Sequence, residues 1–191
     1  MPFTPEMRRK VDQIRDYLYG GGYPDPLTNA EQLSYLFFFY MIEGIDSANL
    51  RQAKATGQAY KSLFAGDWTL RNPRNAPAKG IENVPRERMR WSSWANALSG
   101  EQLVTWVRDE VFPFFAEIGD AYGMSFMAQA RLVIDEPTVL TQVCHAGERA
   151  AAGKRRPRHQ GRFVRACIAA NQAGWRAGSV PHTAAYYSRN R

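Results

Sequence analysis

The residue types that most often bind metals or act as nucleophiles are confined to the last quarter of this 191-residue chain. All three histidines and both cysteines follow Val143. A structural zinc site needs closely spaced pairs of Cys or His, with two to four or three to five residues between them, and no such spacing occurs. We therefore expect no metal site, and we expect Cys144 and Cys167 to be free thiols, as is usual inside cells.

The acidic residues do not suggest a catalytic arrangement either. The adjacent pairs, Asp109 with Glu110 and Asp135 with Glu136, diverge on a helix, which suits solvent contact or helix capping better than shared acid–base catalysis. Gly-rich phosphate-binding loops, the His-Glu-x-x-His pattern and the Gly-x-Ser-x-Gly pattern are absent. We predict no catalytic or cofactor-binding residue in residues 1–143.

A run of positive charge offers another kind of chemistry, the binding of phosphate or of a partner protein. Residues 65–85 contain two glycines and three prolines, which predicts a long loop with one end fixed to the core by Trp68 and Leu70. A loop of this length usually has a function, so a contact with DNA phosphate or a partner subunit competes here with a plain surface crossover. The candidate contact residues are Arg71, Arg74, Lys79, Arg86, Arg88 and Arg90.

The net charge of +7 comes entirely from the end of the chain. Residues 144–191 contain ten Lys or Arg and one acid, whereas residues 1–143 contain 15 basic and 17 acidic side chains. A basic tail could bind nucleic acid without sequence preference. The body of the protein gives no such indication from its net charge.

One apolar helix should position the rest of the domain. Thr28 with Glu31 resembles a capping box, Gly44 suits a helix end, and nearly every residue from Leu33 to Ile42 is apolar. This run is much shorter than the roughly 20 residues that cross a membrane. We therefore predict a buried helix over 28–44 within a surrounding layer of helices.

The surrounding helices can be placed from their capping and periodicity. A first amphipathic helix follows Thr4-Pro5 and ends at the glycines from position 20, and Ser47 could begin a short polar helix to Ala55. Trp91 and Trp94 share one face, and Ser99 should cap a helix that buries Leu103, Trp106, Val107 and the stem of Glu110 and is kinked at Pro113. Further helices are predicted over 124–134 and from Pro137.

The prediction is an all-α compact bundle over residues 1–143, followed by a disordered or loosely structured basic tail over 144–191. The N-terminus lacks a signal peptide, which predicts a cytoplasmic protein.

Four segments carry a resemblance to a known family. They are Arg-Asp-Tyr-Leu-Tyr-Gly-Gly-Gly-Tyr at 15–23, the core helix at 30–46, Arg-Trp-Ser-Ser-Trp-Ala at 90–95 and the Arg-Leu-Val-Ile-Asp-Glu-Pro segment that opens 131–143. Together they resemble the N-terminal helical domain of the modification (M) subunit of type I restriction-modification systems. Members of this family are adenine-N6 DNA methyltransferases that use S-adenosylmethionine.

The resemblance implies a role without implying an active site. It suggests that this domain helps the methyltransferase subunit to hold DNA and to meet the specificity and restriction subunits. The family's catalytic domain carries a Gly-rich cofactor motif and an Asn-Pro-Pro-Phe/Tyr motif, and neither occurs in these 191 residues. No catalytic or cofactor residue can be carried over, so we expect no methylation by this chain alone.

The tail departs from the family in a way that suggests a frameshift. Where the family continues with Asp-Thr-Lys-Gly-Asp-Leu-Phe-Glu and Gly-Glu-Leu-Gly-Gln-Phe-Arg-Thr-Pro, this chain has unrelated residues at 158–165 and 175–183. The genetic code allows the family motifs if the same codons are read one base later: the single Trp codon, followed by an Arg codon, then gives Gly. We therefore predict a shift of the translation frame near 143–145.

Two other classes of function remain open from the sequence. The chain could be a stand-alone helical protein-interaction module, which the net charge of −2 for residues 1–143 favours. It could also be a nucleic-acid binder that works through its tail, in which case affinity should fall steeply with salt.

Overall fold

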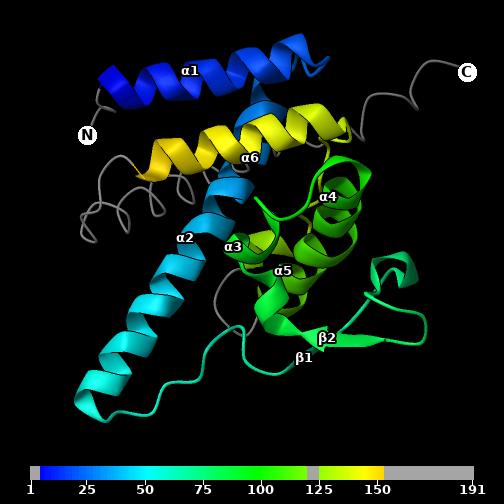
Figure 1. Cartoon of the computed structure of the whole chain (residues 1–191). Helices are drawn as coiled ribbons and strands as arrows, with labels where there is room; N and C mark the ends of the chain where they lie inside the picture. Colours follow the sequence, from blue (N-terminus) through cyan, green and yellow to red (C-terminus); the bar gives the residue numbers. More distant parts are fainter. Residues whose placement is uncertain (1–4, 120–124, 153–191) are drawn as a thin grey trace, which may run out of the picture.

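The computed structural model describes residues 5–119 and 125–152. The described part is mostly helical, as predicted. In Figure 1, α1 and α6 lie side by side at one end of the molecule, α2 runs from them to the other end, α3 packs against α2, and α4 packs against α6. The bounds are α1 (Pro5–Gly20), α2 (Pro26–Thr56), α3 (Trp91–Trp94), α4 (Gly100–Trp106), α5 (Phe112–Gly119) and α6 (Pro137–Ala152).

The central helix is longer at both ends than the predicted 28–44. Asp25, not Thr28, is its N-cap: the Asp25 carboxylate accepts hydrogen bonds from the backbone N–H groups of Leu27 and Thr28. Gly44 lies within α2, and the helix ends instead at Gly57, which has a φ of 70°. The separate polar helix predicted from Ser47 is therefore wrong, because it is the continuation of α2.

The predicted burial of the apolar run is confirmed. Phe39 is fully buried and lies 4.7 Å from Phe115 and 5.1 Å from Phe112 between ring centroids, with Trp94 at 6.4 Å. These rings belong to two other helices, α3 and α5, so the middle of α2 is enclosed by aromatic side chains. Its C-terminal part carries mostly exposed side chains and projects from the body (Figure 1).

The prediction of an all-α domain needs one correction. Two short strands, β1 (Asp67–Thr69) and β2 (Asn83–Pro85), pair antiparallel within the predicted loop 65–85, with Trp68 opposite Val84. Each strand has only one inward side chain, which is too short a pattern to recognise as alternation. The connection between them, residues 70–82, contains a short 3₁₀ turn, η1 (Pro73–Asn75). As predicted, Trp68 is buried, and Leu70 packs against the core.

A π-helical turn, η3 (Val107–Val111), joins α4 to α5 where a kink at Pro113 was predicted. The Phe112 N–H donates to the Val107 carbonyl, five residues back, and Pro113 then enters α5 near its start, where its missing N–H costs little. Ser99 occupies the predicted N-cap of α4, although its side chain makes no capping hydrogen bond.

The helix predicted over 124–134 is wrong for the described residues of that range. Only a 3₁₀ turn, η5 (Ser125–Met127), forms, and the chain then runs without helix to Pro137. The buried amide of Gln32 explains this: it donates to the Arg131 carbonyl and accepts from the Val133 N–H, both at 2.9 Å. These bonds replace the internal hydrogen bonds that a helix would have supplied.

The predicted start of α6 at Pro137 is confirmed. Val139, Leu140 and Val143 are buried, and the helix continues through Cys144 and Ala146, which are also buried, to Ala152. The rest of the tail predicted to be disordered, from position 153, lies outside the described residues. Within the described ranges, no helix combines the length and apolar character needed to cross a membrane.

Close packing of α1 against α6 gives a first testable prediction. A Cβ added at Gly21 would lie 2.4 Å from the Val139 Cγ2 atom, so Gly21→Ala should lower the free energy of unfolding by about 1–3 kcal/mol. Gly20→Ala is the matched control, because nothing lies within 4 Å of its added Cβ. We expect the control to be neutral or to stabilise by up to about 1 kcal/mol. Urea titrations of both variants test this, and equal effects would contradict the packing argument.

Candidate nucleic-acid interface

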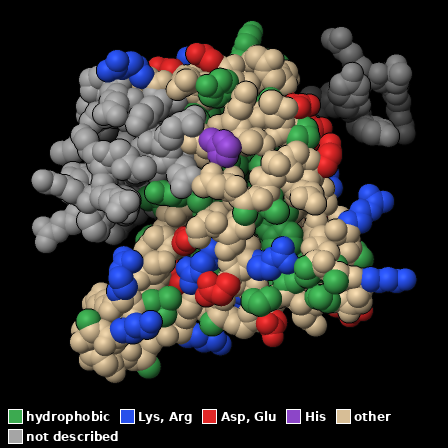
Figure 2. All heavy atoms as spheres, viewed as in Figure 1, with side chains coloured by type: hydrophobic (Ala, Val, Ile, Leu, Met, Phe, Trp, Pro, Cys, Tyr) green, Lys and Arg blue, Asp and Glu red, His purple; other side chains and the backbone are tan. Residues whose placement is uncertain are grey.

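Positive charge is concentrated in one continuous segment, residues 51–90, which we call the basic end. This segment contains nine Lys or Arg and three Asp or Glu, although residues 1–143 as a whole have a slight negative net charge. Figure 2 shows most of the Lys and Arg side chains of the visible face over this end, around the C-terminal part of α2 and the strands. The folded domain therefore has a charge asymmetry that its net charge conceals.

A buried carboxylate fixes the connection between the two strands. Glu110, in the π-helical turn, is fully buried. Its Oε2 atom accepts from the Trp68 indole N–H at 2.8 Å and the Arg71 backbone N–H at 3.0 Å, and its Oε1 atom accepts from the Asn72 N–H at 2.9 Å and the Asn75 side-chain amide at 2.8 Å. Four donors from residues 68–75 thus converge on one side chain.

The neighbouring acid strengthens this attachment. Asp109 accepts a hydrogen bond from the Asn72 side-chain amide and pairs with Arg108, and the bond from Arg108 is the main reason that the pKa of Asp109 is lowered. The sequence-based expectation that both acids are solvated or capping is wrong for Glu110, whose burial is complete.

Four arginines of the basic end lie over aromatic rings of the core. The guanidinium carbon is 5.2 Å from the ring centroid for Arg71 over Trp68 and 5.9 Å for Arg86 over Phe114. For Arg88 over Trp106 the distance is 4.6 Å, and for Arg90 over Phe64 it is 4.3 Å. All four distances are within the range of cation–π attraction.

The six candidate contact residues divide into groups with different surroundings. Arg74 and Lys79 are exposed on the connection between the strands. Arg71 is exposed and also pairs with Glu117, whereas Arg86 and Arg88 are partly buried. Arg90 differs from the others because its side chain is only 11% exposed and pairs with Asp46 and Glu87.

Arg90 belongs to a second network centred on a buried carboxylate. Asp46 is fully buried and accepts hydrogen bonds from Tyr60, Ser62, the Leu63 N–H and Arg90 at 2.8–3.0 Å. Burial by itself raises the pKa of Asp46, but these hydrogen bonds outweigh it and hold the pKa below its ordinary value. Arg90 is thus engaged in joining α2 to the segment after the strands.

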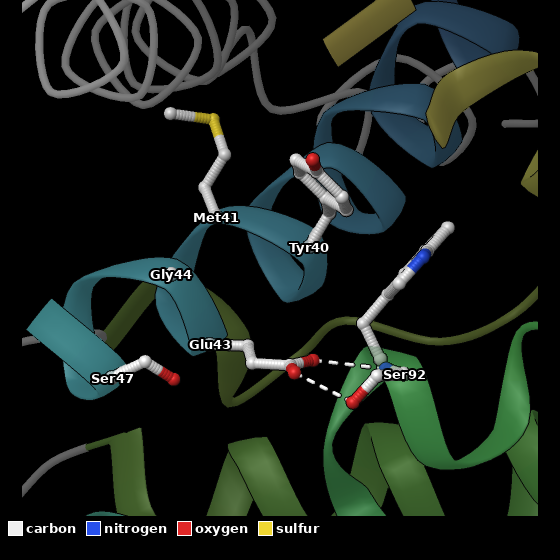
Figure 3. A pocket seen from close by; sticks show the side chains of 7 residues that line it. Tyr40, Met41, Glu43, Gly44, Ser47 and Ser92 are labelled. Atoms are coloured by element: carbon white, nitrogen blue, oxygen red, sulfur yellow. Dashed lines mark hydrogen bonds between the residues drawn. The ribbon is translucent and has the colours of Figure 1, made fainter. Parts of the chain in front are cut away.

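A groove of about 200 Å³ lies between α2 and α3, lined by Tyr40, Met41, Glu43, Gly44, Ser47, Trp91 and Ser92. Its one charged lining residue is already engaged. The Glu43 carboxylate accepts from the Ser92 N–H at 2.9 Å and from the Ser92 hydroxyl at 2.6 Å, as Figure 3 shows. Glu43 therefore ties α2 to α3 and is poorly placed to act as a general base.

Sequence reasoning missed the two buried carboxylates that organise this region. Glu110 follows Leu103 and Val107 at helical spacing and precedes Phe114, so an acid on a buried stripe was a usable signal. Asp46 was harder to recognise, because the predicted helix ended at Gly44 and so did not include Asp46 among the buried positions of α2. Among the residues that the structure describes, no cluster of three or more His, Cys, Asp or Glu could hold a metal ion.

Comparison with known families gives one match. The profile of the family described as "HsdM N-terminal domain", the N-terminal domain of the type I restriction-modification M subunit, matches residues 7–146. The match covers the described helices and strands almost completely and includes the basic end. No curated protein and no solved structure shows a significant match.

Proposed function

The chain belongs to the family of HsdM N-terminal domains, and we propose that it contributes a DNA-contact surface to a type I restriction-modification methyltransferase. The observation that carries this proposal is the basic end, a single segment that contains nine Lys or Arg and only three acidic residues. Such a surface suits sequence-independent contact with phosphates, which positions an enzyme on DNA without specifying a site. The target site would then be chosen by a separate specificity subunit.

The proposal includes assembly with the specificity and restriction subunits. Two large apolar side chains, Tyr19 near the end of α1 and Leu27 at the start of α2, are 68% and 73% exposed. Leu27 lies at the opposite end of α2 from the basic end. Exposed apolar groups of this size support a protein contact there, which would leave the basic end available for DNA.

We do not assign the methyl-transfer step to these residues. The methyl transfer of the family, from S-adenosylmethionine to adenine N6, would need a catalytic domain, and the cofactor and Asn-Pro-Pro motifs are not found in these residues. No residue here fits a cofactor role, so none is given one. We expect the subunit to act in the cytoplasm.

We also propose that the translation frame shifts near 143–145, so that the residues after the shift are read out of frame. The concentration of basic residues, His and Cys after position 143, and the end of the family match at 146, support this proposal. The nucleotide sequence of the locus tests it. Codons that do not yield the family motifs when read one base later would contradict it.

DNA binding by the full chain is the direct test of the contact surface. Arg74→Gln with Lys79→Gln should weaken binding to a duplex about tenfold near 0.1 M salt and lower the slope of log affinity against log salt by roughly two. The matched control removes two cations from α1, Arg9→Gln with Arg15→Gln, and should have little effect. Fluorescence anisotropy over a salt series measures both quantities.

A third variant separates the alternatives. Arg155→Gln with Arg156→Gln removes two cations from the tail and leaves the basic end unchanged. If affinity falls only with the tail variant, the chain binds nucleic acid through its tail. If the unchanged chain binds no DNA at low salt, the protein-interaction module is favoured.

A further inference from the structure

We propose that Arg71, Arg86 and Arg88 are preorganised by aromatic rings to bind phosphates of a DNA strand, and we call these three side chains the arginine row. This inference rests on the proposed DNA contact and adds to it. It states which cations supply affinity through fixed geometry and which supply charge alone. The evidence is the placement of these guanidinium groups on rigid aromatic rings.

Two members of the row rest on one connected group of rings. Arg71 lies over Trp68, and the Trp68 and Phe114 rings meet edge to face with centroids 5.5 Å apart. Arg86 lies over Phe114, which is itself fully buried. Both guanidinium groups are therefore supported by rings of the core. The Arg71 guanidinium also pairs with the Glu117 carboxylate, so Arg86 is the freer of the two to bind an anion.

The third member has its own support. Arg88 lies 4.6 Å from the centroid of Trp106, which is buried in α4. Within the described part of the chain, no carboxylate pairs with the Arg88 guanidinium. Its charge is thus held in place by an uncharged ring and stays available to an anion.

A guanidinium group held over the face of a ring keeps its planar fork of N–H donors, which matches two oxygens of one phosphate. A side chain already held in this orientation loses little conformational freedom when it binds. Arg86 also donates from Nε to the Asp67 carbonyl at 3.1 Å, which leaves its terminal nitrogens for a ligand.

The exposed cations of the connection provide the contrast. Arg74 and Lys79 lie outside these ring contacts, and the Arg74 backbone N–H donates to the Asn72 side chain. Their contribution should depend on charge, and Arg and Lys should be interchangeable there. In the arginine row, by contrast, Lys keeps the charge but cannot reproduce the planar fork.

Charge-preserving variants of the full chain test this difference. Arg88→Lys and Arg86→Lys should each weaken binding to a random-sequence duplex about three- to tenfold, with the salt slope unchanged. Arg74→Lys is the matched control and should change affinity by less than about twofold. Thermal melting of each variant checks that folding is retained. Arg88→Lys is the cleaner test, because Arg86→Lys also removes the hydrogen bond from Arg86 Nε to the Asp67 carbonyl.

The outcomes distinguish this inference from the proposed function. If the unchanged chain binds duplex but Arg86→Lys and Arg88→Lys bind equally well, the arginine row is overturned while the DNA contact stands. If Arg74→Lys weakens binding as much as the row variants, preorganisation is also refuted. An unchanged chain that binds an acidic protein surface but no duplex overturns both.

Discussion

Replacing Glu110 by Gln is expected to lower the free energy of unfolding by about 3 kcal/mol, because hydrogen bonds to a buried carboxylate are strong and costly to lose. Each carboxylate oxygen of Glu110 accepts two hydrogen bonds. In the variant, one oxygen becomes an NH₂ group that lies next to two hydrogen-bond donors and cannot accept a hydrogen bond from either. The shape of the side chain is kept, so the loss reports on the hydrogen bonds rather than on packing.

The control for this variant is Glu117→Gln, which changes an exposed acid of α5 that pairs with Arg71. An exposed ion pair contributes less than about 1 kcal/mol, so this control should have little effect. Denaturant titrations measure both, and amide hydrogen exchange of residues 67–85 should rise only in Glu110→Gln. Equal stability of the two variants would show that Glu110 does not hold the strands and their connection.

Replacing Arg90 by Met is expected to destabilise the domain by about 3–5 kcal/mol at neutral pH, because it leaves the charge of a buried carboxylate without its counter-ion. Asp46 would retain hydrogen bonds from Tyr60, Ser62 and Leu63 but no cation. The same substitution at Arg108, whose partner Asp109 is partly exposed, should cost less than about 1 kcal/mol.

The pH dependence provides a second measurement on Arg90→Met. The pKa of Asp46 is lower in the folded protein than its ordinary value of 3.8. Its ionised form therefore contributes stability above that value, and the contribution is lost as pH falls through the folded pKa. Without Arg90 the pKa of Asp46 should rise, so the difference from the unchanged protein should shrink as pH falls below about 4. A difference that stays constant from pH 7 to pH 3 would show that the loss comes from packing alone.

Both networks explain why the basic end is a defined surface. Glu110 attaches the connection between the strands to the π-helical turn, and Asp46 with Arg90 attaches the segment after the strands to α2. Arg90 lies in the same basic run as Arg86 and Arg88, yet its side chain stabilises the fold by pairing with the buried Asp46. A variant of Arg90 that lost DNA binding would therefore report on folding rather than on phosphate contact.

The amino-acid sequence by itself determined the helical class, the buried aromatic run in α2, the helix irregularity next to Pro113, the helix start at Pro137 and the family of the domain. These features depend on local spacing and on residue types such as Pro and Phe, which act within one or two helical turns. Helix ends were less certain, as Gly44 shows, because a glycine within a helix costs only about 1 kcal/mol and surrounding contacts can offset that cost.

Only the tertiary structure decided the pairing of β1 with β2, the extended course of residues 131–136 and the different roles of the six basic residues. Each of these depends on partners far away in the chain: Val84 for Trp68, Gln32 for Val133, Asp46 for Arg90. The free energy of a buried hydrogen bond or ion pair depends on which groups meet after folding, and local sequence does not contain that information.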